Sequence, residues 1–292
     1  MSLETKRILL TGSSGQVGWE LKKSLERSCQ LISPNRKEFN LSEPESLREK
    51  IIEWKPDLII NPAAYTAVDQ AETDHELAFA INSVSPKVMA QEAEKLGIPM
   101  IHFSTDYIFD GKKNTPYTEK DSPNPINVYG LSKLAGDENI IKTTDNHLIF
   151  RASWVYGMRR SNFLLTMMRL LSNNDEVKVI NDQRGTPTWS KFIAKTSADI
   201  SMQILKVNEL EEDKFGVFNL STGGNVSWFD FATEIKETFY KFTEVDITSI
   251  ESKDYPTKAT RPKYSVLDKS KLELTFGIKT YDWIHHFKEC VK

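Results

Sequence analysis

Short apolar runs of strand length alternate with longer segments of helical period along the first half of the chain. The runs are RILLT, QLIS, DLIIN, MIHFS and HLIFR, and the helical segments between them span about 16–27, 44–54, 74–96 and 127–142. Continuous apolar strands joined by amphipathic helices are typical of a parallel sheet covered on both faces. The pattern therefore predicts an α/β chain built on a doubly wound parallel sheet.

The second half of the chain continues this alternation only in part. VKVIN at residues 177–181 and GVFNLS at 216–221 predict two further strands of the same sheet, and the segments around them contain no repeating unit. We expect these segments to form a smaller, discontinuous C-terminal lobe. The predicted ranges are 1–154, 176–189 and 215–222 for the sheet domain, and 155–175, 190–214 and 223–292 for the lobe.

Charge and hydropathy exclude two classes of partner. The 292 residues carry a formal net charge of −3 and no dense run of lysine or arginine, which argues against nucleic acid. No stretch approaches the roughly 20 apolar residues of a membrane span, and no secretory segment precedes the first strand. We expect no membrane contact and a cytoplasmic location.

Glycines recur at every third residue directly after the first predicted strand. The segment TGSSGQVG holds Gly12, Gly15 and Gly18. Glycines at such a turn let the backbone approach a pyrophosphate, and the N-terminus of the following helix offers free N–H groups to the phosphates. The spacing differs from GxGxxG, but its place in the first strand-turn-helix unit predicts a dinucleotide-binding Rossmann domain.

The residues after the second strand bear on which dinucleotide is bound. An acidic residue there would hold the ribose 2′-hydroxyl of NAD, whereas arginine accommodates the 2′-phosphate of NADP. Here the strand runs into Asn35, Arg36 and Lys37, with no acid before Glu38. The sequence favours NADPH as the cofactor and leaves NADH open.

A tyrosine and a lysine four residues apart, Tyr129 and Lys133, lie in the predicted helix over 127–142. This spacing puts both side chains on one face, where the ammonium would lower the phenol pKa from about 10. The fourth strand ends in STDY at residues 104–107, at the sheet edge where open α/β folds bind ligands. The third strand ends in small residues that suit a backbone passing close to a cofactor: Pro62, Ala63 and Ala64.

Seven segments in order resemble the extended short-chain dehydrogenase/reductase family over about residues 6–285: TGSSGQVGWEL, NPAAYTAVDQAE, STDYIFDG, YGLSK, FRASWVYG, INDQRGTPT and RPKYSVLD. The resemblance implies that Tyr129 is the proton donor, that Lys133 tunes it and holds the nicotinamide ribose, and that Thr105 binds the substrate carbonyl. The substrate contacts that it implies are Val68, Asp69, Asp106, Tyr107 and Trp154. The cofactor-binding residues that we predict are Gly12, Ser14, Gly15, Gln16, Val17, Gly18, Asn35, Arg36, Ala63, Ala64, Tyr65, Tyr129 and Lys133.

The same resemblance implies hydride transfer from NADPH to the 4-keto group of a nucleotide-linked 6-deoxy sugar, giving a dTDP-L-rhamnose-type product. Dehydratases of this family carry an Asp–Glu pair after the threonine, where this chain has Asp106 and Tyr107. Elimination then lacks its second carboxylate, so reduction is favoured over dehydration. Trp154 offers a flat apolar face on which a sugar can stack, or which ordinary core packing can cover. The family usually has alanine where this chain has Pro62, and a small residue or asparagine where it has Tyr264.

Two other functions stay open at this point. The regulatory β subunit of methionine adenosyltransferase is similar to these reductases and acts mainly as a cofactor-binding partner protein. A reductase of another nucleotide-linked 4-keto-6-deoxy sugar, or one with the opposite stereochemistry at C4, would carry the same motifs. No metal site is predicted, and the sequence leaves a homodimer open.

Overall fold

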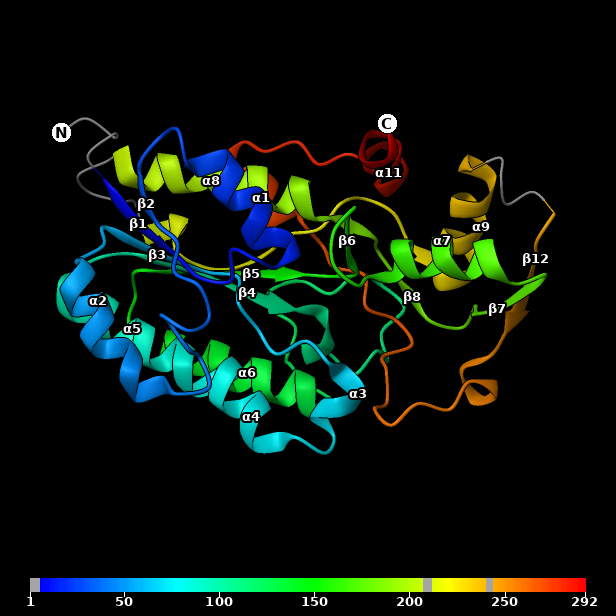
Figure 1. Cartoon of the computed structure of the whole chain (residues 1–292), viewed down its shortest axis with the longest axis horizontal. Coiled ribbons are helices and arrows are strands. Elements are labelled where there is room, and N and C mark those ends of the chain that lie inside the picture. The colour runs from blue at the N-terminus through cyan, green and yellow to red at the C-terminus, as the bar shows by residue number, and fades with distance from the viewer. Residues whose placement is uncertain (1–5, 207–211, 240–243) are drawn as a thin grey trace.

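The centre of the molecule is a six-stranded parallel sheet (Figure 1). The computed structural model describes residues 6–206, 212–239 and 244–292, and within them the strand order is β10-β5-β4-β3-β1-β2. The strands are β1 (Arg7–Leu10), β2 (Gln30–Ile32), β3 (Leu58–Asn61), β4 (Met100–Thr105), β5 (His147–Ala152) and β10 (Gly216–Asn219). The chain winds outward from β1 to β2 and then crosses to β3, so the carboxyl ends of β1 and β3 flank the switch point where such sheets bind ligands.

Helices cover both faces of this sheet, as the apolar runs predicted (Figure 1). Successive residues of β1 point to opposite faces: Ile8 and Leu10 belong to one core and Leu9 to the other. The helices of the first core are α1 (Gln16–Leu25), α8 (Ser190–Lys206) and α10 (Ser270–Phe276). Those of the second core are α2 (Leu47–Trp54), α5 (Ser85–Leu96) and α6 (Val128–Ile141).

A third, smaller core lies beyond the carboxyl end of the sheet and is aromatic (Figure 1). Phe231 packs edge-on against Trp283 and Phe287 and contacts Tyr156. The elements around this core are α7 (Phe163–Asn173), β7 (Glu176–Ile180), α9 (Trp228–Thr238), β12 (Asp246–Ile250) and α11 (Trp283–Val291). Two short strand pairs belong to the same part of the molecule: β6 (Val155–Tyr156) pairs with β9 (Thr188–Trp189), and β8 (Arg184–Gly185) pairs with β11 (Val226–Ser227).

Two expectations about the second half of the chain differ from the structure. The strand expected at 177–181 exists as β7, but the prediction that it extends the central sheet is wrong, because among the described residues β7 pairs in parallel only with β12. Helix α8, expected in the lobe, covers the sheet, since Ile193 and Ile200 lie in the same core as Ile8. Elsewhere the two-lobe division stays a prediction, and residues 1–5, 207–211 and 240–243 of its ranges lie outside the described residues.

No helix in the described ranges is both long enough and apolar enough to cross a bilayer.

Candidate active site

The turn between β1 and α1 is shaped by glycines at two close backbone approaches. Gly12 has a φ of +56°, and a Cβ there would lie 2.9 Å from the Cα of Ala63 after β3. A Cβ on Gly18 would lie 2.2 Å from the carbonyl oxygen of Gly12. Gly15 stands at the N-cap of α1 without a side-chain cap, so the first N–H groups of the helix remain available to an anion. The local sequence thus forms a cradle that side chains would fill.

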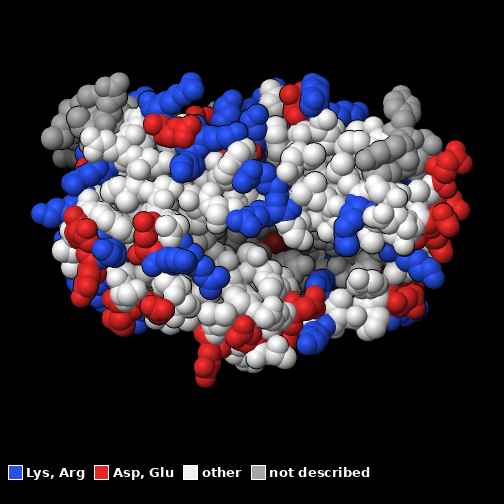
Figure 2. Space-filling model, in the orientation of Figure 1, with Lys and Arg blue, Asp and Glu red and all other residues white. Residues whose placement is uncertain are grey.

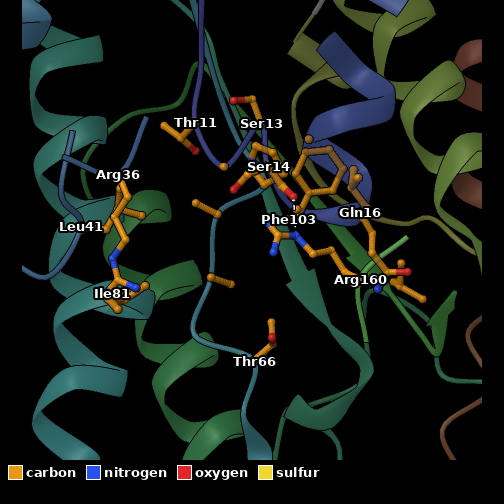
Figure 3. A pocket seen from close by; sticks show the side chains of 18 of the residues that line it. Thr11, Ser13, Ser14, Gln16, Arg36, Leu41, Thr66, Ile81, Phe103 and Arg160 are labelled. Carbon is orange, nitrogen blue, oxygen red and sulfur yellow. Dashed lines mark hydrogen bonds between the residues drawn. The ribbon is translucent and has the colours of Figure 1, made fainter. Parts of the chain in front are cut away.

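A cavity of about 790 Å³ opens at this turn (Figure 3). Its size falls within the range of cofactor sites in proteins. In Figure 3, Ser13 and Ser14 lie at the glycine turn, Arg36 lies on one side of the cavity and Arg160 on the other. Arg160 reaches the turn from the loop after β6, where its Nε donates to the Ser14 carbonyl at 2.8 Å. Segments far apart in the sequence therefore meet around one cavity.

The lining of this cavity is basic. Its charged members are Lys22, Arg36, Lys133 and Arg160, and none of its described lining residues is acidic. Figure 2 shows basic side chains above and beside the hollow near the middle of this face. Glu38, the first acid after β2, accepts a hydrogen bond from the Asn35 backbone at 2.9 Å and is not part of the lining. Such a lining attracts phosphate groups, and the glycine cradle provides the backbone N–H groups to bind them.

Most predicted cofactor-binding residues line this cavity. They are Gly12, Ser14, Gly15, Gln16, Val17, Gly18, Asn35, Arg36, Ala63, Ala64, Tyr129 and Lys133. Tyr65 lies outside the lining, because its hydroxyl donates to Asp74 and its backbone N–H to Asn82. Sequence reasoning missed Arg160 and Ser161, which come from a loop that no motif connects to the glycine turn.

Helix α6 presents Tyr129 and Lys133 to the cavity. The Asn127 side chain caps its first turn by accepting from the Gly130 N–H at 2.8 Å. Gly130 lets the helix approach the chain after β4, since a Cβ there would lie 2.2 Å from the Tyr107 carbonyl oxygen. The hydroxyls of Tyr129 and Thr105 share a hydrogen bond. The cap and the glycine contact thus fix the helix end that carries the phenol against the end of β4.

The protonation state of Tyr129 differs from the sequence expectation. Loss of hydration raises the pKa of Tyr129 to about 12, and the hydrogen bond that it shares with Thr105 offsets this only in part. The expected lowering of this pKa by Lys133 is wrong, because the lysine ammonium is directed elsewhere. Its Nζ lies 3.0 Å from Nε2 of His102 and 2.5 Å from the carbonyl oxygen of Phe103. Tyr129 is therefore a neutral phenol that keeps a proton to donate.

Burial changes the other ionisable groups at the end of β4 as well. Desolvation lowers the pKa of Lys133 to about 8, although Asp137 opposes this shift. Asp106 is buried, and desolvation raises its pKa to about 7, against hydrogen bonds from Ser265 and Thr105. Its Oδ2 has no hydrogen-bond partner. Both groups consequently change charge close to neutral pH.

The predicted substrate residues gather beside this cavity and not in its lining. Asp69 of α3 (Val68–Ala71) forms a two-bond ion pair with Arg261, with Nη2 to Oδ2 at 2.6 Å and Nη1 to Oδ1 at 3.2 Å. Arg261 also hydrogen-bonds to the Tyr107 hydroxyl, and the Tyr107 ring packs edge-on against Tyr129. Val68 opens α3 and is half-buried. Sequence reasoning did not single out Arg261, although this residue lies in the RPKYSVLD segment.

The remaining predicted substrate residue, Trp154, packs against another indole ring. Its backbone has a φ of +45°, and its ring stacks on Trp228 with centroids 3.4 Å apart and planes 6° apart. A Cβ on Gly185 would lie 2.4 Å from the same indole. The structure therefore covers one face of the ring that sequence analysis assigned to a sugar.

We expect Asp106→Asn to stabilise the protein increasingly as pH rises from about 4 to about 7. In the folded protein the carboxyl stays protonated up to about pH 7, whereas its ordinary pKa is 3.8, so ionisation in this window favours the unfolded chain. Each pKa unit corresponds to about 1.4 kcal/mol, which predicts a gain of a few kcal/mol above pH 7. Urea unfolding of both proteins at several pH values measures the difference between their free energies of unfolding.

Asp175→Asn is the control, because Asp175 is exposed. Its free energy of unfolding should follow that of the unsubstituted protein throughout. If the difference in free energy of unfolding between Asp106→Asn and the unsubstituted protein does not change with pH, the raised pKa of Asp106 is contradicted.

The fold and the cavity define a dinucleotide-binding Rossmann protein with the tyrosine and lysine of a short-chain reductase. The chain belongs to the family described as the RmlD substrate binding domain, whose model matches residues 6–292.

A dTDP-4-dehydrorhamnose reductase of Burkholderia thailandensis is 38% identical over 98% of both chains. Solved structures of dTDP-4-dehydrorhamnose reductases are similar throughout. That from Clostridium acetobutylicum has a TM-score of 0.88 at 36% identity and covers 98% of both chains. That from Bacillus anthracis, in complex with NADP, has a TM-score of 0.89 at 30% identity and covers 98% of this chain and 99% of that one.

Proposed function

We propose that this protein reduces the 4-keto group of dTDP-4-dehydro-L-rhamnose with NADPH, giving dTDP-L-rhamnose. The observation that carries the proposal is that Tyr129 and Lys133 line the same basic cavity as the glycine turn. A phosphate cradle and a neutral acid within one cavity are what reduction of a carbonyl by a nicotinamide cofactor requires. The full-length similarity to reductases of this name supports the choice of substrate.

In this mechanism the residues of α6 and of the end of β4 have separate roles. Bound NADPH supplies the hydride. Tyr129 donates its proton to the oxygen that develops charge at C4, and Thr105, which shares a hydrogen bond with Tyr129, stabilises that oxygen. Lys133, which lines the same cavity, holds the nicotinamide ribose. Val68, Asp69, Asp106, Tyr107 and Trp154 are proposed to contact the nucleotide sugar.

Conversion of the sugar tests the reaction directly. The purified protein is mixed with NADPH and dTDP-4-dehydro-L-rhamnose, the loss of NADPH absorbance is followed, and the product is identified by NMR. Formation of dTDP-L-rhamnose establishes both the reaction and the stereochemistry at C4. Binding of NADPH without oxidation would reject this substrate and favour another 4-keto sugar or a regulatory, non-catalytic role.

We expect Arg36→Ala to weaken NADPH binding by about 10- to 100-fold and to leave NADH binding nearly unchanged. Arg36 lines the cavity beyond β2, and a hydrogen bond to a charged group contributes about 1.5–3 kcal/mol. Only NADPH carries the 2′-phosphate that this guanidinium would bind. Fluorescence titration with both cofactors measures the two dissociation constants.

Lys37→Ala is the matched control, because Lys37 follows Arg36 directly, is exposed and is not part of the lining. It should bind NADPH as the unsubstituted protein does. Equal losses for NADPH and NADH in Arg36→Ala would remove the assignment of Arg36 to the 2′-phosphate.

The proposal also includes a cytoplasmic location, which rests on sequence reasoning, whereas the sequence leaves a homodimer open. Sedimentation equilibrium of the purified chain, with and without NADPH, measures the oligomeric state.

A further inference from the structure

A chain of buried hydrogen bonds runs beneath the cavity from Lys133 to the start of the glycine turn. Nζ of Lys133 lies 3.0 Å from Nε2 of His102, and Nδ1 of His102 lies 3.1 Å from Nδ2 of Asn61. Oδ1 of Asn61 accepts a hydrogen bond from the Thr11 hydroxyl at 2.5 Å. All four side chains are at least 99% buried. None of the mechanistic roles described above involves His102 or Asn61.

Strand register brings these residues together from distant parts of the sequence. Asn61 at the end of β3 is paired with His102 in β4, and the Thr11 N–H donates to the carbonyl oxygen of Ile60. Thr11 directly precedes Gly12, so the chain of hydrogen bonds ends where the phosphate cradle begins. It spans three neighbouring strands, β1, β3 and β4, and then reaches Lys133 on α6.

The direction of the donors along this chain is coupled to the charge of Lys133. A neutral imidazole carries one N–H, so it can donate from only one ring nitrogen and must accept at the other. When the Asn61 amide donates to Nδ1, the proton of His102 sits on Nε2 and faces Lys133, which can accept it only as a neutral amine. When Lys133 is an ammonium, it donates to Nε2, and Nδ1–H then donates to the oxygen of a rotated Asn61 amide.

The surroundings favour a neutral histidine in both arrangements. Burial and the neighbouring Lys133 hold the pKa of His102 well below its usual range. The other ionisable groups facing this pair are Asp137 on α6, whose Oδ1 lies 4.0 Å from Nε2 of His102, and Arg151 on β5, which interacts with Asp137. Asp137 accepts from the Ser104 hydroxyl at 2.5 Å, and burial raises its pKa. At the cavity end, Tyr129 interacts with Asp106 and Asp137.

We propose that His102 is a positioning residue for the reduction: its Nε2 fixes the Lys133 amine at the floor of the cavity, and its Nδ1 is held in turn by Asn61 and Thr11. The inference rests on the proposed function, because it gives Lys133 a part in turnover. A neutral imidazole can offer Lys133 an acceptor nitrogen when the lysine is an ammonium and an N–H donor when it is an amine, so this contact is kept in both charge states. Its position is then preserved when Tyr129 loses its proton and the charge nearby changes.

Two amide substitutions at one position separate positioning from mere packing. The terminal amide of glutamine overlies the Nε2 position of histidine, so His102→Gln retains a polar atom for Lys133 and gives up the contact with Asn61. The amide of asparagine overlies the Nδ1 position, so His102→Asn retains the contact with Asn61 and gives up Lys133. Each variant therefore loses one of the two hydrogen bonds of the ring.

We expect His102→Asn to lower kcat by about 10²-fold, the size of effect that a misplacement of about 1 Å produces, and His102→Gln to stay within a few-fold of the unsubstituted protein. His147, buried at the start of β5 on the Thr144 carbonyl, provides the control, because His147→Asn should alter stability and leave kcat unchanged. Equal kcat values for His102→Asn and His102→Gln, whether both normal or both low, would overturn the proposal.

A second measurement does not depend on turnover. In protein labelled with ¹⁵N-histidine, the resonances missing from His102→Gln identify His102 among the 5 histidines. We expect its Nε2 resonance to move in Lys133→Met and to stay in place in Lys37→Ala. An Nε2 signal unchanged by Lys133→Met would overturn the pairing. If the unsubstituted protein does not reduce the sugar, the proposed function fails, and these spectra still decide whether His102 holds Lys133.

Discussion

Tyr129→Phe is expected to lower kcat by about 10²- to 10⁴-fold, the contribution typical of general acid catalysis. The substitution removes only the hydroxyl, which shares a hydrogen bond with Thr105 and has its pKa raised to about 12 by burial. The ring remains to pack edge-on against Tyr107. Steady-state kinetics with NADPH and the keto sugar measure kcat, and fluorescence titration should give an unchanged dissociation constant for NADPH.

Tyr255→Phe is the matched control, because this tyrosine is 56% exposed and lies outside the cavity lining. It should retain full turnover. Normal rates for Tyr129→Phe would remove its assignment as proton donor, whereas a loss of NADPH affinity equal to the loss of kcat would mean that the hydroxyl serves binding.

Gly18→Ala is expected to weaken NADPH binding by about 10²-fold or more, the effect of losing one or two hydrogen bonds to a charged group. The added Cβ would lie 2.2 Å from the carbonyl oxygen and 2.7 Å from the carbonyl carbon of Gly12. Both are backbone atoms, so the turn itself must move, and the N–H groups of the phosphate cradle move with it. The melting temperature should also fall, since overpacking costs about 1–3 kcal/mol.

Gly97→Ala distinguishes loss of the cradle from general destabilisation. Gly97 ends α5 with a φ of +64°, so alanine is strained there, yet its Cβ would meet no atom within 4 Å. The strain costs roughly 1–2 kcal/mol. We expect a lower melting temperature with normal NADPH affinity, measured by thermal unfolding and by titration. Similar losses of affinity in the two glycine variants would contradict the role given to Gly18.

The central sheet and its helices follow from local pattern. Buried parallel strands are apolar throughout and amphipathic helices have a period of 3.6 residues, so β1, β3, β4 and β5 could be located from the sequence. The pairing of β7 could not, because VKVI alternates buried and exposed residues and forms a two-stranded ribbon with β12. Nothing in the local sequence of β7 distinguishes the two partners.

The residues of the candidate site also fall into two groups: those that local sequence features predict and those that only the tertiary structure reveals. The glycine turn and the Tyr129–Lys133 spacing are local features, and both line the cavity as expected. Arg160 reaches the site from a loop without a motif of its own and becomes visible only through its contact with Ser14. Arg261 lies in the RPKYSVLD segment, but its part in the site becomes visible only through its ion pair with Asp69. The covered face of Trp154 likewise depends on Trp228, which lies far along the chain.

The sequence by itself determined the α/β class, the glycine turn and the pair of side chains proposed for the reduction, because each depends on residues within a few positions of one another. Only the tertiary structure decided their charge states and partners. Burial keeps Tyr129 protonated and lowers the pKa of Lys133 to about 8, and strand register sets His102 against that lysine. Desolvation and strand register come from chain segments far apart in the sequence, so no local pattern encodes them.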